Sequence, residues 1–432
     1  MDHPSSLTEM QIEVWRRDRD GQRFHLACAM LFLCMMAVST ALSGISFAIL
    51  LVVSIIRYGR IAFYYKPLWR IKGLWLMPLW LIWCLLTLFW SSDPGQGLDE
   101  LGAARHLLLP LMLWPLLGER NRLIAALLVG IFFQNMVQLA QALDLSDLMK
   151  HGAGDRAGGW LHPIQTGVFC GAALCWYLAT LIHERSPKRW LVLIPALAAF
   201  FGLIVSGSRG PWLACFIVLP LQFVFLLIRL PERRRFIIQL ALASLIIGAL
   251  GGWLGRSMIQ PRLEQAKTEY IQAIENGDYG TSVGLRIGLW TWAWDSFRER
   301  PILGHGLGSY RNQILKQPTY QIAAERWPRK AENYMQRDHA HSIYLHLLAC
   351  AGIVGATLFV IFLIWSLVAA WRMPRSQALN EGVLSILLLW MLTAQFDALH
   401  LIGHMFGLLM FLISLTLAAT DQSDPPAKTS HQ

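Results

Sequence analysis

Long apolar stretches separated by short polar turns make up most of the chain. A helix that crosses a bilayer needs about 20 mostly apolar residues, and about twelve stretches approach or meet that requirement. The pattern therefore predicts an all-α polytopic membrane protein with about 12 transmembrane helices, the first two joined by a tight turn at Ser43 and Gly44. The expected spans are residues 24–42, 44–56, 74–90, 101–117, 123–143, 163–182, 190–205, 212–228, 236–254, 343–371, 383–399 and 401–419.

One long polar stretch, Arg256–His341, interrupts this pattern between the ninth and tenth expected spans. Apolar residues recur in it at helical spacing over Pro261–Asn276 and again over Arg286–Arg300, which predicts two helices, the first ended by Gly277. The stretch combines cations with aromatic residues, namely Arg262, Arg286, Arg298, Arg311, Arg326, Arg337, Trp290, Trp292, Trp294, Tyr310 and Trp327. We expect a membrane protein with one such segment to carry out its chemistry there.

The composition is that of a membrane protein. Hydrophobic residues make up 55% of the chain and charged residues only 15%, whereas soluble proteins carry about 25% charged residues. A net charge of +10 would suggest a nucleic-acid partner for a soluble protein, but in a membrane protein it reflects Lys and Arg kept in cytoplasmic loops. We therefore expect membrane lipids and no nucleic acid as partners. The first apolar run lacks a clear cleavage site, so no cleavable signal peptide is expected.

The distribution of Lys and Arg predicts the orientation of the chain in the membrane. With a cytoplasmic N-terminus, the cytoplasmic loops are almost all basic, as expected for short loops on that side. These loops are the N-terminal tail and residues 57–72, 118–122, 183–189, 229–235 and 372–375. The opposite loops, 43–44, 91–100 and 206–211, are poor in Lys and Arg, and the loop 144–162 begins with an acidic residue. We thus expect one integral membrane domain over 1–432, with a large outer loop at 256–341 and a cytoplasmic tail at 420–432.

Two arginines stand where an anion can bind. Arg209 lies between two expected spans, in the sequence SGSRGP at residues 206–211, and Arg286 opens the second helix expected in the large loop. A guanidinium group binds phosphate oxygens in a bidentate manner, and the N-terminus of a helix adds to such a site. Arg209 has an alternative as a boundary arginine that reaches lipid headgroups. Arg286 has one as an ordinary helix-terminal arginine, and both alternatives stay open.

The large loop ends in two histidines, His339 and His341, directly before the next apolar run. Histidine is suited to general acid–base chemistry near neutral pH. Neither a carboxylate nor a cysteine stands near them at the usual spacing of zinc ligands, so we expect no metal and no cofactor. Arg105 and His106, near the outer end of the fourth expected span, are candidates for the same cavity, because a charge within a span is costly unless it faces a polar interior.

A third candidate in the large loop is the glycine-rich sequence Gly-His-Gly-Leu-Gly at residues 304–308. It has the glycine content of a phosphate-binding loop, but no strand precedes it, as the dinucleotide and P-loop motifs require. A plain turn is the better interpretation of this sequence.

At these residues the chain resembles the O-antigen ligase family. The resemblance rests on short motifs in a fixed order: SGSRG at 206–210, Arg286 with Ile287 and Trp290, PILGHG at 301–306, HAHSIYL at 339–345 and GIVG at 352–355. The topology is similar along the whole chain, and the motifs cover residues 206–355. In this family Asn usually follows the histidine, whereas this chain has Ser342 there.

The resemblance implies a GT-C-like membrane fold and a glycosyltransferase. Its donor would be O-antigen on undecaprenyl diphosphate, and its acceptor lipid A–core, on the periplasmic face of the bacterial inner membrane. Arg209 and Arg286, with Arg105 as a further candidate, would bind the diphosphate. His341 would act as the base, because Tyr344 and Leu345 follow it at the family's spacing. His339 is the alternative base. Arginines can neutralise the leaving group, so an inverting reaction would need no metal.

Three other functions remain open. An O-antigen polymerase would use the same donor with a second lipid-linked glycan as the acceptor, and a protein oligosaccharyltransferase would offer a groove to a peptide. A secondary transporter belongs to a different class, and would need buried charges near mid-bilayer and paired broken helices. The polar groups of this chain gather at the outer boundary of the spans, which disfavours transport.

Overall fold

A computed structural model describes residues 13–143, 145, 156–254, 256–373 and 378–420 of the chain. The predicted tail beyond Thr420, the loop residue Arg375 and much of the predicted 144–162 loop lie outside these residues. Within the described residues the secondary structure is helical and contains no strand. The prediction of an all-α protein is therefore confirmed.

The helices vary widely in length. The longer helices are α2 (Arg19–Met36), α3 (Thr40–Ile61), α4 (Leu76–Thr87), α7 (Arg120–Ala142), α8 (Pro163–His183), α9 (Leu193–Val205), α10 (Arg209–Arg229), α11 (Arg234–Leu254), α12 (Arg256–Asn276), α13 (Ser282–Glu299), α17 (Ile343–Arg372), α18 (Ala378–Thr393) and α19 (Gly403–Thr420). The shorter α-helices are α5 (Pro94–Glu100), α6 (Leu109–Leu113), α14 (Tyr310–Ile314), α15 (Pro318–Arg326) and α16 (Pro328–Lys330). The 3₁₀-helices are η1 (Ala62–Tyr65), η2 (Leu68–Arg70), η3 (Lys72–Trp75), η4 (Leu88–Trp90), η5 (Leu101–Leu108), η6 (Trp114–Glu119), η7 (Pro187–Val192), η8 (Pro231–Arg233) and η10 (Leu399–Leu401), and η9 (Ala331–Met335) is a short π-helix.

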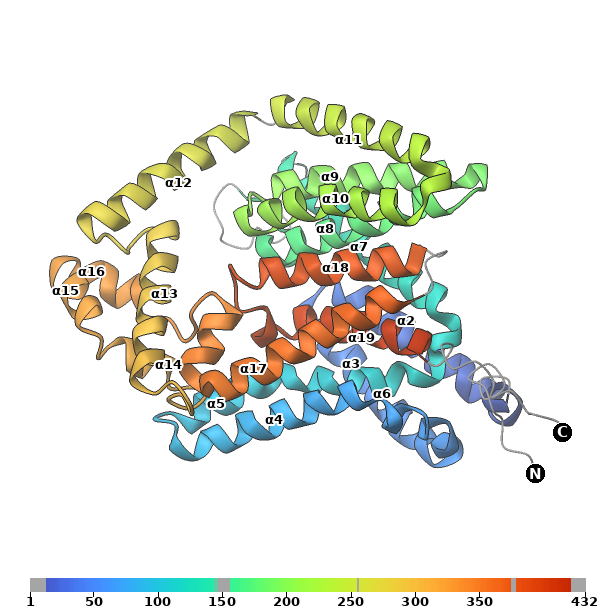
Figure 1. Ribbon diagram of the computed structural model, residues 1–432, viewed down its shortest axis with the longest axis horizontal. Helices are drawn as coiled ribbons and strands as arrows, with labels where there is room; N and C mark the ends of the chain where they lie inside the picture. Colours follow the sequence, from blue (N-terminus) through green and yellow to red (C-terminus); the bar gives the residue numbers. More distant parts are fainter. Residues whose placement is uncertain (1–12, 144, 146–155, 255, 374–377, 421–432) are drawn as a thin grey trace.

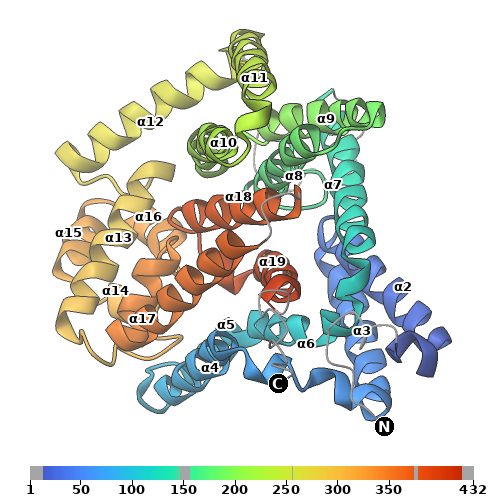
Figure 2. The same ribbon diagram turned by 45° about the vertical axis from the view of Figure 1, so that its right-hand side comes forward.

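The long apolar helices lie side by side, and the helices of the large loop gather at one end of them (Figure 1). α13 to α16 occupy the left-hand end in Figure 1, whereas α2 begins and α19 ends toward the right. α8 lies near the centre, packed against α9 and α18, while α11 and α12 form an outer edge in both views (Figures 1 and 2). The predicted polar loop thus covers the end of the bundle opposite the start of α2.

In the described part of the chain, eight helical segments are long and apolar enough to cross a membrane, which confirms a multi-pass membrane protein. One of them, Pro94–Ala142, has 49 residues, far more than the roughly 20 that a single crossing requires. It contains the two predicted spans 101–117 and 123–143. The described helices α2, α18 and α19 match three further predicted spans, but they fall outside the eight segments. The total of about 12 transmembrane helices stays a prediction.

Two helix boundaries differ from the prediction. The first turn is at residues 37–39 and not at Ser43 and Gly44, because the Ser39 hydroxyl caps α3 by accepting the Leu42 N–H at 3.5 Å. Gly44 lies inside α3 with open space around its Cα. The predicted continuous span 101–117 consists of η5, α6 and η6, with a proline in the first turn of each of the last two. Proline cannot donate a backbone hydrogen bond, which favours such breaks.

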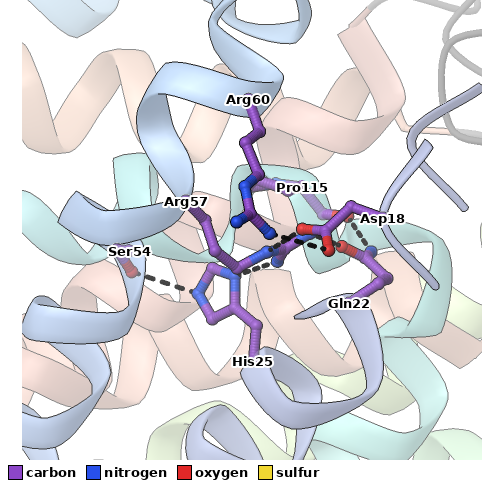
Figure 3. A network of polar contacts seen from close by, with 7 residues as sticks. All are labelled: Asp18, Gln22, His25, Ser54, Arg57, Arg60 and Pro115. Carbon is purple, nitrogen blue, oxygen red and sulfur yellow. Dashed lines mark hydrogen bonds and ion pairs between the residues drawn. The ribbon is translucent and has the colours of Figure 1, made fainter. Parts of the chain in front are cut away.

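Arg57 is a second difference, because it was expected in a basic loop and is instead buried in α3. Its guanidinium group lies 2.8 Å from the Asp18 carboxylate, 2.8 Å from the Gln22 side-chain oxygen and 2.6 Å from Nδ1 of His25. The other ring nitrogen of His25 meets the Ser54 hydroxyl at 3.1 Å. Figure 3 shows these side chains converging from α2 and α3. Because the buried charge is paired and hydrogen-bonded, the network ties the two helices together.

Arg229 was also expected in a basic loop and is buried where α10 ends. It pairs with the Glu381 carboxylate at 2.9 Å, hydrogen-bonds to Asn380 and stacks over the Trp371 ring at 3.7 Å. The partners come from the end of α17 and the start of α18. A buried arginine needs such a set of partners, so Arg229 joins three helices and is not a free loop charge.

The glycine-rich sequence at 304–308, with the three residues before it, packs against a kink in α17. Gly352, with φ of 65°, interrupts the helical backbone, and a side chain there would lie 2.1 Å from the carbonyl oxygen of Ile302. Backbone hydrogen bonds join the two segments, from the His305 N–H to the Ala349 oxygen at 3.0 Å and from the Ile353 N–H to the Pro301 oxygen at 2.8 Å. The sequence therefore has a structural explanation as a turn, which agrees with the interpretation made from the missing strand.

Candidate active site

His341 lies between η9 and α17, beside a carboxylate from a distant part of the chain. Its Nδ1 is 3.1 Å from Oδ1 of Asp397, which lies in the turn between α18 and η10. The Asp397 side chain is 10% exposed and that of His341 22% exposed. His341 has a φ of 47°. Among the described residues other than glycine, it is the one with a positive φ. A non-glycine residue in this region is uncommon, and such residues cluster at functional sites.

The backbone holds these two segments together. The Ile343 N–H donates to the Ala394 oxygen at 3.0 Å, and the Tyr344 hydroxyl donates to the Met391 oxygen at 2.9 Å. Ser342, which stands where the resembling family usually has Asn, is the N-cap of α17. The hydrogen bond to the histidine is thus supplied by Asp397, while the residue after His341 begins the helix.

The contact with Asp397 fixes the orientation of the His341 ring. Burial on its own would raise the pKa of the Asp397 carboxyl, but the hydrogen bond from His341 and neighbouring charges, including that of Arg286, hold this pKa below its usual value. The carboxylate is therefore ionised near neutral pH. A carboxylate bound to one ring nitrogen fixes the orientation of the imidazole and favours a proton on the other nitrogen. This leaves Nε2 of His341 as the atom that can accept a proton.

His339 lies against His341, with ring centroids 4.5 Å apart and planes at 62°. Burial, together with the positive charge of His341, lowers the pKa of His339 to about 3. The ring is therefore neutral over the pH range in which enzymes usually work. Both predicted histidines belong to one cluster, but their environments differ.

A base that must be unprotonated to act makes the transfer rate fall at low pH, and we call this fall the acid limb of the pH–rate profile. We expect a His339→Gln variant to keep this acid limb unchanged. A histidine whose pKa lies near 3 loses its proton as pH rises through that value, so from pH 5 to pH 8 the substitution exchanges one neutral group for another. The measurement is the transfer rate of both proteins across this range. If the acid limb disappears in the variant, His339 is the group that titrates and the assignment of the base to His341 is wrong.

Arg286 enters the same site from α13, whose N-terminus is capped by Thr281. Its Nε donates to the Phe396 carbonyl at 3.3 Å and its Nη1 to the Ser282 carbonyl at 3.1 Å. These bonds orient the guanidinium group next to Asp397, with which Arg286 interacts electrostatically. The arginine predicted from the loop helix and the predicted histidine are therefore close to one another.

Arg209 is the first residue of α10, and its neighbour Gly210 lies against Phe396, the residue before Asp397. Gly210 allows this approach, since a side chain there would lie 3.2 Å from Cβ of Phe396. The Arg209 Nη1 lies 3.6 Å from the Glu269 carboxylate of α12. The start of α10, the start of α17 and the end of α18 lie on the same side of the bundle as α13 (Figure 1). Arg286 thus contacts the segment that carries Asp397, and the start of α10, where Arg209 stands, packs beside it.

The pair Arg105 and His106 is placed differently. Arg105 is exposed on η5, and a side chain at Gly403 would begin 3.5 Å from its Nη2. His106 is buried between the rings of Phe32 and Phe47. A part for Arg105 in binding diphosphate stays a prediction.

Several polar residues of the site were missed by the sequence analysis. Asp397 was absorbed into the expected span 383–399, although a lone carboxylate within an apolar run is itself a sign of function. His162, the N-cap of α8, interacts electrostatically with His341 and Asp397. Arg156 lies against Gly207 and was expected only as part of a polar loop. For these two the sequence held no comparable signal.

Asp397 also changes the question of a metal. Ligand atoms of His339, His341 and Asp397 lie within 4.8 Å of one another, a grouping that could hold a metal ion. The expectation of no metal rested on the absence of a nearby carboxylate, and the structure supplies one from 56 residues further along the chain. Whether the two histidines and the carboxylate bind a metal ion can be tested by adding a chelator.

The fold and this cluster define a class: a polytopic α-helical membrane protein with a His–Asp pair beside two arginines at one end of its bundle. Residues 194–360 match the family model described as O-antigen ligase. The resemblance found in the sequence is therefore confirmed over this region, which is less than half of the chain. The matched region contains Arg209, Arg286, His339 and His341, while Asp397 lies beyond it.

A curated relative is known from Haemophilus influenzae, where it bears the name "Uncharacterized protein". It is 22% identical over 213 residues, which are 49% of this chain and 49% of the relative. The chain thus spans about half the length of the curated relative that it matches.

Proposed function

We propose that this protein ligates O-antigen from undecaprenyl diphosphate onto lipid A–core at the periplasmic face of the bacterial inner membrane. The observation that carries the proposal is the contact of His341 with Asp397 beside Arg286. Such a pair suits the abstraction of a proton from a hydroxyl group, and the arginine suits an anionic leaving group. Members of the superfamily use a lipid-linked polysaccharide, which has an anionic leaving group, and an acceptor with a hydroxyl group.

The arginines support a diphosphate donor. A lipid diphosphate carries its charge at the boundary between lipid and water, at the end of a long apolar chain. Arg209 and Arg286 lie where the apolar helices α10 and α17 meet the polar loop. Guanidinium groups bind phosphate oxygens in a bidentate manner and stabilise the negative charge that develops as a phosphate leaves. We assign the diphosphate to these two arginines.

The proposed reaction is a single displacement. The acceptor hydroxyl attacks the anomeric carbon of the donor glycan and loses its proton to Nε2 of His341. The new bond joins the acceptor oxygen to that carbon, and the bond from the carbon to the phosphate oxygen breaks. The electron pair leaves with undecaprenyl diphosphate, whose charge the arginines neutralise. Attack on the face opposite the leaving group inverts the anomeric carbon.

The proposed orientation places both termini in the cytoplasm and the large loop, 256–341, in the periplasm. It is supported by the basic loops predicted on the N-terminal side and by the loop helices at the opposite end of the bundle (Figure 1). In this orientation the donor and the acceptor lie in the same outer leaflet. Both lipids can then reach His341 from the membrane.

Deletion of the gene in the source bacterium is expected to leave lipid A–core without long glycan, while lipid-linked O-antigen accumulates. The measurement is electrophoresis of lipopolysaccharide together with mass analysis of the undecaprenyl-linked pool, with a plasmid copy as the control. A lipid A–core that still carries a single repeat unit would identify a polymerase. Unchanged lipopolysaccharide with unglycosylated protein would identify a protein oligosaccharyltransferase. Either result would contradict the ligase proposal.

A further inference from the structure

Glu269 of α12 places a carboxylate against Arg209. Its side chain is 8% exposed, and its Oε2 lies 3.6 Å from Nη1 of Arg209. The same oxygen accepts the N–H of Val283, the second residue of α13, at 2.9 Å. One buried carboxylate thus meets both a guanidinium group and the N-terminal turn of an 18-residue helix. These are two of the features that bind phosphate in proteins.

Arg209 is incompletely satisfied in this arrangement. Its Nη1 is buried and has no hydrogen-bond partner, because the carboxylate stands at ion-pair distance but not in hydrogen-bond geometry. A buried donor without an acceptor is costly. The site therefore has a donor that a larger anion, with more oxygens to share, would satisfy better than Glu269 does.

We infer that Glu269 occupies the phosphate position of the donor site and must yield when the diphosphate binds. The inference rests on the proposed function, since it takes Arg209 as a ligand of the diphosphate. The Glu269 carboxylate compensates the charge of Arg209. A single carboxylate or a weakly charged headgroup then gains little by displacing it, while a diphosphate gains much more. Glu269 is thus a specificity-determining residue that selects strong anions.

The position of α12 allows such a displacement. α12 packs mainly on α13 and lies at the outer edge of the molecule in both views (Figures 1 and 2). Of the preceding α11, only Ile237 and Gly251 are buried against the rest of the described chain. Moving the Glu269 side chain, or α12 with it, therefore disturbs little of the core around α8.

The test is the affinity of the purified full-length protein for inorganic pyrophosphate, measured by calorimetry in detergent. In a Glu269→Gln variant the amide oxygen can still accept the Val283 N–H, but the negative charge is lost. We expect the Kd for pyrophosphate to fall by about two- to fivefold, as the loss of one competing ion pair would give. Glu275→Gln, at an exposed position on the same helix, is the matched control and should leave the Kd unchanged.

A second variant guards against misfolding of the first. Glu269→Asp keeps the charge but withdraws it from Arg209 by one methylene group, so the Kd should fall by less than in Glu269→Gln. An unchanged or higher Kd in both variants would overturn the inference. The readout is independent of the proposed function: tighter pyrophosphate binding without any glycan transfer by the wild type would retain the role of Glu269 and reject the reaction. Normal glycan transfer by the wild type, with the same Kd for pyrophosphate in the wild type and both variants, would retain the reaction and reject the role of Glu269.

Discussion

Replacement of His341 by alanine is expected to lower the rate of glycan transfer by about 10²–10⁴-fold, the usual contribution of a general base. The effect should appear in kcat, while binding of the lipid-linked donor stays close to that of the wild type. The reason is that Arg209 and Arg286, which we assign to the diphosphate, do not depend on the imidazole for their own contacts. Transfer assays and donor-binding assays on the same purified variant separate the two effects.

Two neighbouring variants serve as controls for this prediction. Asp397→Asn should also reduce kcat, because the amide no longer stabilises the imidazolium that forms when His341 takes the proton. His339→Ala should have a smaller effect, since His339 contacts the His341 ring but lacks the bond to Asp397. A rate in His341→Ala equal to that of the wild type would remove His341 from the chemistry.

Loss of either arginine is the second large effect that we expect. Arg209→Ala and Arg286→Ala should each abolish measurable transfer and weaken donor binding, while the proteins remain folded and inserted. Lysine should rescue poorly at both positions, because it keeps the charge but loses the planar fork that binds two oxygens at once. Donor titrations with each variant give the change in KM and kcat.

The matched control for the arginine variants is Arg298→Lys, at an exposed position near the end of α13. It should transfer at the wild-type rate. If Arg209→Lys and Arg286→Lys also do so, the geometry of the guanidinium group is not what the site uses, and the assignment of the diphosphate to these residues would have to be given up.

The fold was largely predictable because a spanning helix leaves a signal in the length of its apolar run. The loop helices could also be predicted, since α12 ends at Asn276 before Gly277, whose φ of 64° is the left-handed conformation in which glycine often ends a helix. The exact ends of the helices were harder to predict from the sequence. Ser39 and the pair Ser43 and Gly44 are similar turn signals, and only the cap made by Ser39 distinguishes them.

The site was predictable only in part, for a physical reason. Arg209, Arg286 and His341 stand in polar sequence, where cations and histidines are visible against their surroundings. Asp397 stands in an apolar run, and its partner His341 lies 56 residues earlier. Contacts that the tertiary fold creates across such a distance leave no mark on local spacing, and the same holds for the contact of Glu269 with Arg209.

Two buried arginines show that the tertiary fold can also remove a residue from the loop in which the sequence places it. Arg57 and Arg229 were counted as loop charges, because each stands at the end of an apolar run. Their partners, Asp18 and Glu381, come from other helices. A basic residue next to a predicted turn can therefore be a buried structural residue, and the charge count that predicts orientation should be weighted toward arginines that remain exposed.

The most direct test of the central claim is transfer by the purified protein, reconstituted with undecaprenyl diphosphate-linked glycan and lipid A–core, in the presence and absence of a chelator. We predict that wild-type protein forms lipid A–core carrying the glycan in the inverted anomeric configuration, releases undecaprenyl diphosphate, and is unaffected by the chelator, while His341→Ala forms almost none. Loss of wild-type activity on chelation, restored by added divalent metal, would contradict the claim and make His339, His341 and Asp397 a metal site.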